Sequence, residues 1–128
     1  MDGPRKKNMI VEDEALSVLS LRMVLQNLGY KVVEAASSGE KALDIIRRER
    51  PDVVLMDVLL AGEMTGIETA IRMRQWHDAP VVFMTGYRDQ ETLEGLGRIE
   101  RATCLFKPFA PEDIARAVSQ ALGEAGSV

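Results

Sequence analysis

The stretch PDVVLMD, residues 51–57, decides the fold of this chain. It is a nearly continuous apolar run of strand length that ends on an acidic residue, Asp57. A strand that is apolar on both faces is typical of the middle of a parallel sheet, where helices cover both sides. The stretch therefore predicts a buried parallel strand with Asp57 at its carboxyl end.

Three other short apolar runs also break off at polar residues. They are residues 9–11 before Glu12 and Asp13, residues 81–84 before Thr85, and residues 104–106 before Lys107. If all four runs are parallel strands of one sheet, these polar residues lie along its carboxyl edge, where open α/β sheets place their ligands. We expect three carboxylates, a hydroxyl and an amine to converge there.

The segments between these runs carry the apolar spacing of helices. The predicted helices are 14–28, 40–48, 66–75, 89–96 and 111–123, and an additional strand is predicted at 31–35. The third helix should bury Ile67, Ala70 and Ile71. The fourth should be short, because Gly95 and Gly97 weaken it. Five alternating strand and helix units predict an α/β fold with one doubly wound parallel sheet.

Length and composition predict a single domain. The 128 residues are 46% hydrophobic and span one ordinary domain, with a core at about 7–123 and loose ends at 1–6 and 124–128. A lone cysteine excludes an internal disulfide and favours a cytoplasmic location. No apolar run has the length of a membrane span, and the net charge of −4 gives no footprint for nucleic acid.

The three acidic residues predict a magnesium site. Glu12 and Asp13 alone would fit an ordinary helix start, and Asp57 alone would fit a loop-initiating turn. Together they would repel one another unless a cation lay between them. Magnesium takes one or two carboxylates and leaves positions for water and phosphate. A carboxylate beside it can act as a nucleophile toward phosphorus, and Lys107 and Thr85 could bind the phosphate oxygens.

These residues together resemble the receiver domain of two-component response regulators, which includes the bacterial chemotaxis regulator. The resemblance covers nearly the whole chain. Its pattern is an acidic pair, an acceptor Asp, a Thr or Ser and a Lys-Pro, which this chain supplies at Glu12-Asp13, Asp57, Thr85 and Lys107-Pro108. The resemblance implies a flavodoxin-like sheet of five strands in the order 2-1-3-4-5, with five helices.

The resemblance also implies roles for single residues. Asp57 would accept a phosphoryl group from a histidine kinase or phosphotransfer protein in a Mg²⁺-dependent reaction. Asp13 and Asp57 would bind the metal directly, Glu12 through water, and Leu59 through its main-chain carbonyl. Thr85 and Lys107 would hold the phosphate. The phosphorylated chain would switch the surface formed by its fourth helix, fifth strand and fifth helix. It would not be an enzyme beyond accepting and slowly releasing the phosphoryl group.

The chain departs from the family pattern at the fifth strand. Cys104 stands three residues before Lys107, where the family usually has Tyr or Phe. The usual aromatic rotamer switch therefore cannot operate. We expect Cys104 to be a small buried hydrophobic residue rather than a redox centre.

The loop after Asp57 departs from the pattern as well. Ala61 replaces a common Pro, and Thr65 replaces an Asp that is usual in one receiver subgroup. Leu59 and Tyr87, two residues beyond Asp57 and Thr85, are bulky groups that predict slow dephosphorylation by shielding. His77 is predicted to lie at the opposite edge of the sheet and to play no part in phosphotransfer.

Other functions stay open from the sequence. The chain could be a vestigial receiver that acts as a phosphorylation-independent adaptor, or the excised receiver of a larger DNA-binding regulator or hybrid histidine kinase. A phosphatase with an Asp nucleophile or a flavodoxin-like mononucleotide binder is disfavoured. No second Asp follows Asp57 at two residues, and no P-loop or other glycine-rich phosphate loop is present. The expected partners are the phosphodonor and a downstream protein or fused output domain, without direct nucleic-acid or membrane contact. A phosphorylation-dependent dimer is left open.

Overall fold

A computed structural model describes residues 4–124. Its strands are β1 (Lys7–Val11), β2 (Lys31–Val32), β3 (Val53–Asp57), β4 (Val81–Thr85) and β5 (Ala102–Phe106). Its helices are α1 (Ala15–Asn27), α2 (Gly39–Glu49), α3 (Gly66–Met73), α4 (Gln90–Gly97) and α5 (Pro111–Ala121). Of the predicted loose ends, residues 1–3 and 125–128 lie outside the described residues.

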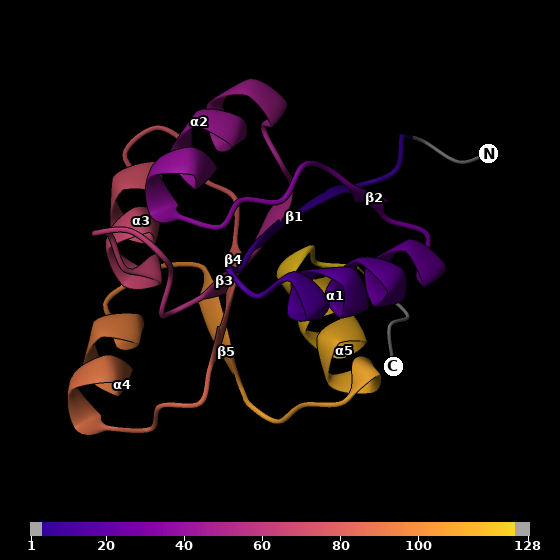
Figure 1. Ribbon diagram of the computed structural model, residues 1–128. Coiled ribbons are helices and arrows are strands. Elements are labelled where there is room, and N and C mark those ends of the chain that lie inside the picture. Colours follow the sequence, from indigo (N-terminus) through magenta and orange to yellow (C-terminus); the bar gives the residue numbers. More distant parts are fainter. Residues whose placement is uncertain (1–3, 125–128) are drawn as a thin grey trace.

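The sheet has the predicted topology. Its five strands are all parallel and lie in the order β2-β1-β3-β4-β5. Helices α2, α3 and α4 cover one face, and α1 and α5 cover the other (Figure 1). This arrangement confirms the doubly wound, flavodoxin-like fold with β3 in the middle of the sheet.

Alternating residues of the central strands build two apolar layers. Val54, Met56 and Phe83 face the helices α2 to α4, whereas Leu55 and Met84 face α1 and α5. All five residues of β3 are buried. The register pairs Val11 with Met56 and Asp57 with Met84, so the carboxyl ends of β1, β3 and β4 lie side by side. The core thus sets the positions of the polar residues that follow these strands.

The edge strand β2 is shorter than predicted. The chain continues beside β1 after Val32, but two residues lie between Val33 and Ala36, whereas one residue lies between their partners Asn8 and Ile10. The extra residue is a bulge that interrupts the ladder. Glu34 at this bulge is exposed and forms an ion pair of 2.8 Å with Arg48.

Helix α3 buries Ala70 and packs Ile67 against the core, as predicted, but the prediction for Ile71 is wrong. Ile71 is 51% exposed, whereas Thr69 is fully buried together with Ala70. Thr69 can be buried because its hydroxyl donates to the carbonyl of Thr65 over 2.7 Å. Gly39 of α2 has no side chain that would collide with it. Helix α4 is short, as predicted. Among residues 4–124, no helix is both long enough and apolar enough to cross a membrane.

Candidate functional site

The four strand ends meet in one pocket of about 400 Å³. It is lined by Glu12, Asp13, Glu14, Asp57, Leu59, Leu60, Thr85, Gly86, Tyr87 and Lys107. The structure therefore brings together every residue that the sequence proposes for the site. It adds Glu14, Leu60 and Gly86, which follow the proposed residues in the chain and carry no separate signal in the sequence.

Asp57 is held at both carboxylate oxygens. Its side chain is only 8% exposed. Oδ1 accepts a hydrogen bond of 2.9 Å from the amide of Leu59, and Oδ2 accepts one of 2.6 Å from Nζ of Lys107. A buried carboxylate needs such partners, because burial without them penalises its charge. The two bonds fix the orientation of Asp57 at the floor of the pocket.

Glu12 is the carboxyl group of the site whose ionised form is disfavoured. Burial is the main cause and the neighbouring Asp57 carboxylate the second, and together they raise the pKa of Glu12 from 4.5 to about 7. The main-chain amide of Glu14 donates to its Oε2 over 3.2 Å, and Nζ of Lys107 lies 3.7 Å from its Oε1. Two carboxylates thus share one amine.

Lys107 is the positive centre of the pocket. Burial disfavours its charge, but the hydrogen bond to Asp57 and the charges of Asp57 and Glu12 outweigh burial, so its pKa is raised. The side chain is 40% exposed. The amine therefore stays charged at neutral pH and faces both the acids and the open side of the pocket.

Thr85 presents a buried hydroxyl to the pocket. The residue is 1% exposed, and its Oγ1 accepts a hydrogen bond of 3.0 Å from the amide of Tyr87. The oxygen is used as an acceptor, so the hydroxyl proton remains available to a ligand oxygen. Leu59 and Tyr87 are 51% and 53% exposed and lie at the mouth of the pocket.

The donor atoms fit a hard divalent cation. Asp13 is exposed at the pocket and Asp57 is buried within it, so two carboxylates and adjacent main-chain carbonyls are available. Within residues 4–124, no three His, Cys, Asp or Glu side chains form a ready metal-binding group. In this structure the Lys107 amine forms an ion pair with the Asp57 carboxylate. Burial first and the Asp57 carboxylate second raise the pKa of Glu12, and a bound cation would offset the charge of that carboxylate.

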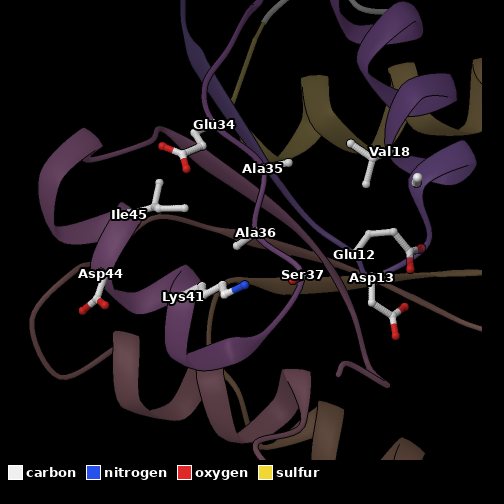
Figure 2. A pocket seen from close by; sticks show the side chains of 11 residues that line it. Glu12, Asp13, Val18, Glu34, Ala35, Ala36, Ser37, Lys41, Asp44 and Ile45 are labelled. Atoms are coloured by element: carbon white, nitrogen blue, oxygen red, sulfur yellow. The ribbon is translucent and has the colours of Figure 1, made fainter. Parts of the chain in front are cut away.

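A second pocket of about 570 Å³ shares Glu12 and Asp13 with the first. Figure 2 shows Asp13 on one side of it and Lys41 of α2 on the other. Ala35 and Ala36 of the bulged segment line it as well. Asp13 therefore lies between the two pockets, and its side chain is open to solvent from both.

Cys104 does not have the full burial expected of it. The residue is half-buried, because β5 is an edge strand whose outer positions are only partly covered. Burial still raises the pKa of its thiol, which disfavours the reactive thiolate. An aromatic ring does lie nearby in sequence: Phe106 lies under the guanidinium of Arg88, 4.0 Å from the ring centre.

His77 lies at the amino end of the sheet, as the topology predicts. Its Nε2 is 2.8 Å from the carbonyl of Pro51, which precedes β3, whereas Asp57 ends that strand. The ring is thus separated from the pocket by the length of the strand.

Known proteins with this fold and sequence identify the family. The response regulator receiver domain matches residues 9–119. Sporulation initiation phosphotransferase F of Bacillus subtilis is 35% identical over 118 residues, which cover 91% of this chain and 94% of that protein. The signal receiver domain of a modulated diguanylate cyclase from Desulfovibrio desulfuricans has a TM-score of 0.85 at 33% identity, over 93% of this chain and 94% of that one.

The chain belongs to the response regulator receiver domain family. It spans only part of several relatives. Transcriptional regulatory protein PdtaR of Mycobacterium tuberculosis is 30% identical over 117 residues, which cover 91% of this chain but 57% of that protein. The chain thus spans about half the length of such relatives.

Proposed function

We propose that Asp57 is the phosphoacceptor of this receiver and that it takes the phosphoryl group from a phosphohistidine. The observation that carries the proposal is the contact of 2.6 Å between Lys107 and a buried, oriented carboxylate at the end of the central strand. Other groups of the pocket support the proposal. It has a positive amine, a buried hydroxyl and an open side toward solvent.

The transfer uses these residues as follows. A carboxylate oxygen of Asp57 attacks phosphorus, an oxygen–phosphorus bond forms, and the bond from phosphorus to the donor imidazole nitrogen breaks. The Lys107 amine exchanges its hydrogen bond with the carboxylate for one with a phosphate oxygen. The Thr85 hydroxyl donates a hydrogen bond to another phosphate oxygen. Mg²⁺, when held by Asp13, Asp57 and the carbonyl of Leu59, with Glu12 behind a water, would neutralise charge on the phosphoryl group.

The phosphodonor would dock beside α1. A groove of about 470 Å³ runs from the pocket between α1 and α5, and it shares Glu12, Glu14 and Lys107 with the site. Leu16 lines this groove, and α1 exposes Leu16, Leu19 and Met23 by 76%, 54% and 56%. A helix that is apolar on its outer face needs a cover. A helical phosphohistidine protein on this face would bring its imidazole to Asp57.

The output would be protein binding rather than enzymatic turnover. The chain would carry no catalysis beyond accepting and slowly releasing the phosphoryl group, and it would act in the cytoplasm, where its lone thiol stays reduced. Its target would be a separate protein or a fused output domain, because several relatives are about twice its length.

Incubation with acetyl phosphate and Mg²⁺, followed by intact mass measurement, tests the proposal. The wild-type protein should gain one phosphoryl group, and the gain should vanish in Asp57→Asn and when EDTA removes the metal. His77→Gln is the control and should keep the gain, because His77 lies at the other end of the sheet. No gain in the wild type would instead support a vestigial, phosphorylation-independent adaptor.

A further inference from the structure

The first turn of α3 lies directly against the main chain of Asp57. Gly66, the first residue of this helix, is buried, and its amide donates to the carbonyl of Val58 over 2.8 Å. A side chain at this position would place its Cβ 2.1 Å from the carbonyl oxygen of Asp57 and 3.1 Å from Cγ of Met56. The obstacle is main chain, so it cannot move aside as a flexible side chain could.

The same turn is closed by reciprocal hydrogen bonds. The hydroxyl of Thr65 accepts from the amide of Glu68 over 3.1 Å, and the Glu68 carboxylate accepts from the amide of Thr65 over 2.9 Å. This capping box fixes where the helix begins. The cap and the absent side chain at Gly66 together determine how closely α3 approaches Asp57.

We propose that Thr65 and Gly66 are positioning residues for phosphoryl transfer: they seat α3 on the Asp57 main chain and so hold its carboxylate in place for attack. The inference rests on the proposed function of Asp57. It concerns residues that touch neither phosphate nor metal. It also assigns a role to Thr65, the N-cap of α3, which replaces the Asp that is usual in one receiver subgroup.

The geometry explains why a small shift at α3 would reach the chemistry. Two hydrogen bonds orient the Asp57 carboxylate, the 2.9 Å bond from the amide of Leu59 and the 2.6 Å bond from Lys107. Leu59 follows Asp57 by two residues in the same segment, whereas Lys107 follows the separate strand β5. A displacement of the carboxyl end of β3 moves the Asp57 carboxylate relative to Lys107 and turns the attacking oxygen away from its line of approach.

The test compares variants that alter the cap with matched controls. Thr65→Ala should slow phosphorylation by acetyl phosphate at saturating Mg²⁺ by about fivefold, and Thr65→Ser, which keeps the hydroxyl, should restore the rate. Gly66→Ala should slow it by between about 10-fold and 100-fold. Ser38→Ala removes the cap of α2, and Gly97→Ala adds a methyl group where no atom lies within 4 Å. Both should keep the wild-type rate.

Two further measurements separate positioning from loss of folding. Each rate is divided by the folded fraction from denaturant unfolding. The amide NMR signal of Leu59, which reports its bond to Asp57, should shift in Thr65→Ala and Gly66→Ala but not in the controls. Wild-type rates per folded molecule in both variants, with an unmoved Leu59 signal, would overturn this inference alone. A wild-type protein that takes no phosphoryl group would overturn the proposed function and the inference with it.

Discussion

The amine of Lys107 lies 2.6 Å from the carboxylate of Asp57, although the two residues are 50 positions apart in the chain. This contact joins the end of β5 to the end of β3 across the intervening strand β4. It places the positive charge of the site at the atom that is proposed to attack phosphorus.

Replacement of Lys107 by Ala should slow phosphoryl transfer more than it harms the fold. The variant loses the charge that would bind a phosphate oxygen, and loss of one such donor typically costs on the order of 100-fold in rate. The measurement is the initial rate of phosphorylation by acetyl phosphate at saturating Mg²⁺. Lys41→Ala, which changes an exposed amine of the neighbouring pocket, is the control and should keep the rate. Equal rates in the two variants would contradict the role of Lys107.

The stability of the metal-free protein should fall as the pH rises through Glu12 ionisation. The pKa of Glu12 is about 7 in the folded protein against 4.5 as its ordinary value, so between these values the folded state binds more protons than the unfolded state. Stability is therefore lost as the pH rises from about 4.5 through about 7. Glu12→Gln should remove this loss and be more stable than wild type at pH 8 by about 2 kcal/mol.

Urea unfolding in EDTA at pH 5 and pH 8 measures this difference. Glu63→Gln changes an exposed carboxylate and should leave the free energy of unfolding within about 0.5 kcal/mol at both pH values. If the free energy of unfolding changes between pH 5 and pH 8 by the same amount in Glu12→Gln and in the wild type, ionisation of Glu12 does not destabilise the fold.

Smaller polar residues at the mouth of the pocket should shorten the life of the phosphorylated protein. Leu59 and Tyr87 are bulky and line the entrance, where they would limit the approach of water to the acyl phosphate. Asn at both positions should speed dephosphorylation by about tenfold, which corresponds to about 1.4 kcal/mol in the barrier. Decay of the phosphorylated mass is the readout, and Leu93→Asn on α4 is the control. An unchanged half-life in the double variant would exclude shielding.

The outer face of α1 should affect the rate of phosphorylation by protein phosphodonors but not by small-molecule phosphodonors. Leu16→Asn with Leu19→Asn should lower phosphotransfer from autophosphorylated histidine kinases by at least about tenfold, since apolar residues at the centre of an interface carry much of its affinity. Phosphorylation by acetyl phosphate should stay at the wild-type rate. Ile71→Asn, an exposed apolar residue on α3, is the control. Parallel losses with both kinds of donor would argue against docking on α1.

The sequence predicts the fold and the residues that form the site, because both depend on where the buried strands lie and end. Buried parallel strands have an obvious apolar pattern, and the residue after each strand must lie at the carboxyl edge. Convergence of Glu12, Asp57, Thr85 and Lys107 in one pocket therefore follows from topology alone.

Close approaches between elements cannot be predicted in this way. The bulge after Val33 shortens β2, and nothing in the apolar pattern announces an extra residue. Thr69 is polar yet buried, because Gly39 lets α2 approach it. Cys104 is only half-covered, because the edge position of β5 limits its burial. The contact of Gly66 with Asp57 depends on the exact path of the loop between β3 and α3.

Reduction of the phosphorylated protein with borohydride, followed by peptide mass spectrometry, tests the central claim most directly. Borohydride converts an acyl phosphate to an alcohol and so marks the carboxylate that carried the phosphoryl group. The structure predicts a homoserine at position 57 and unmodified residues at Glu12 and Asp13, which line the same pocket. A reduced residue at position 12 or 13, with Asp57 intact, would contradict the assignment of Asp57 as the phosphoacceptor.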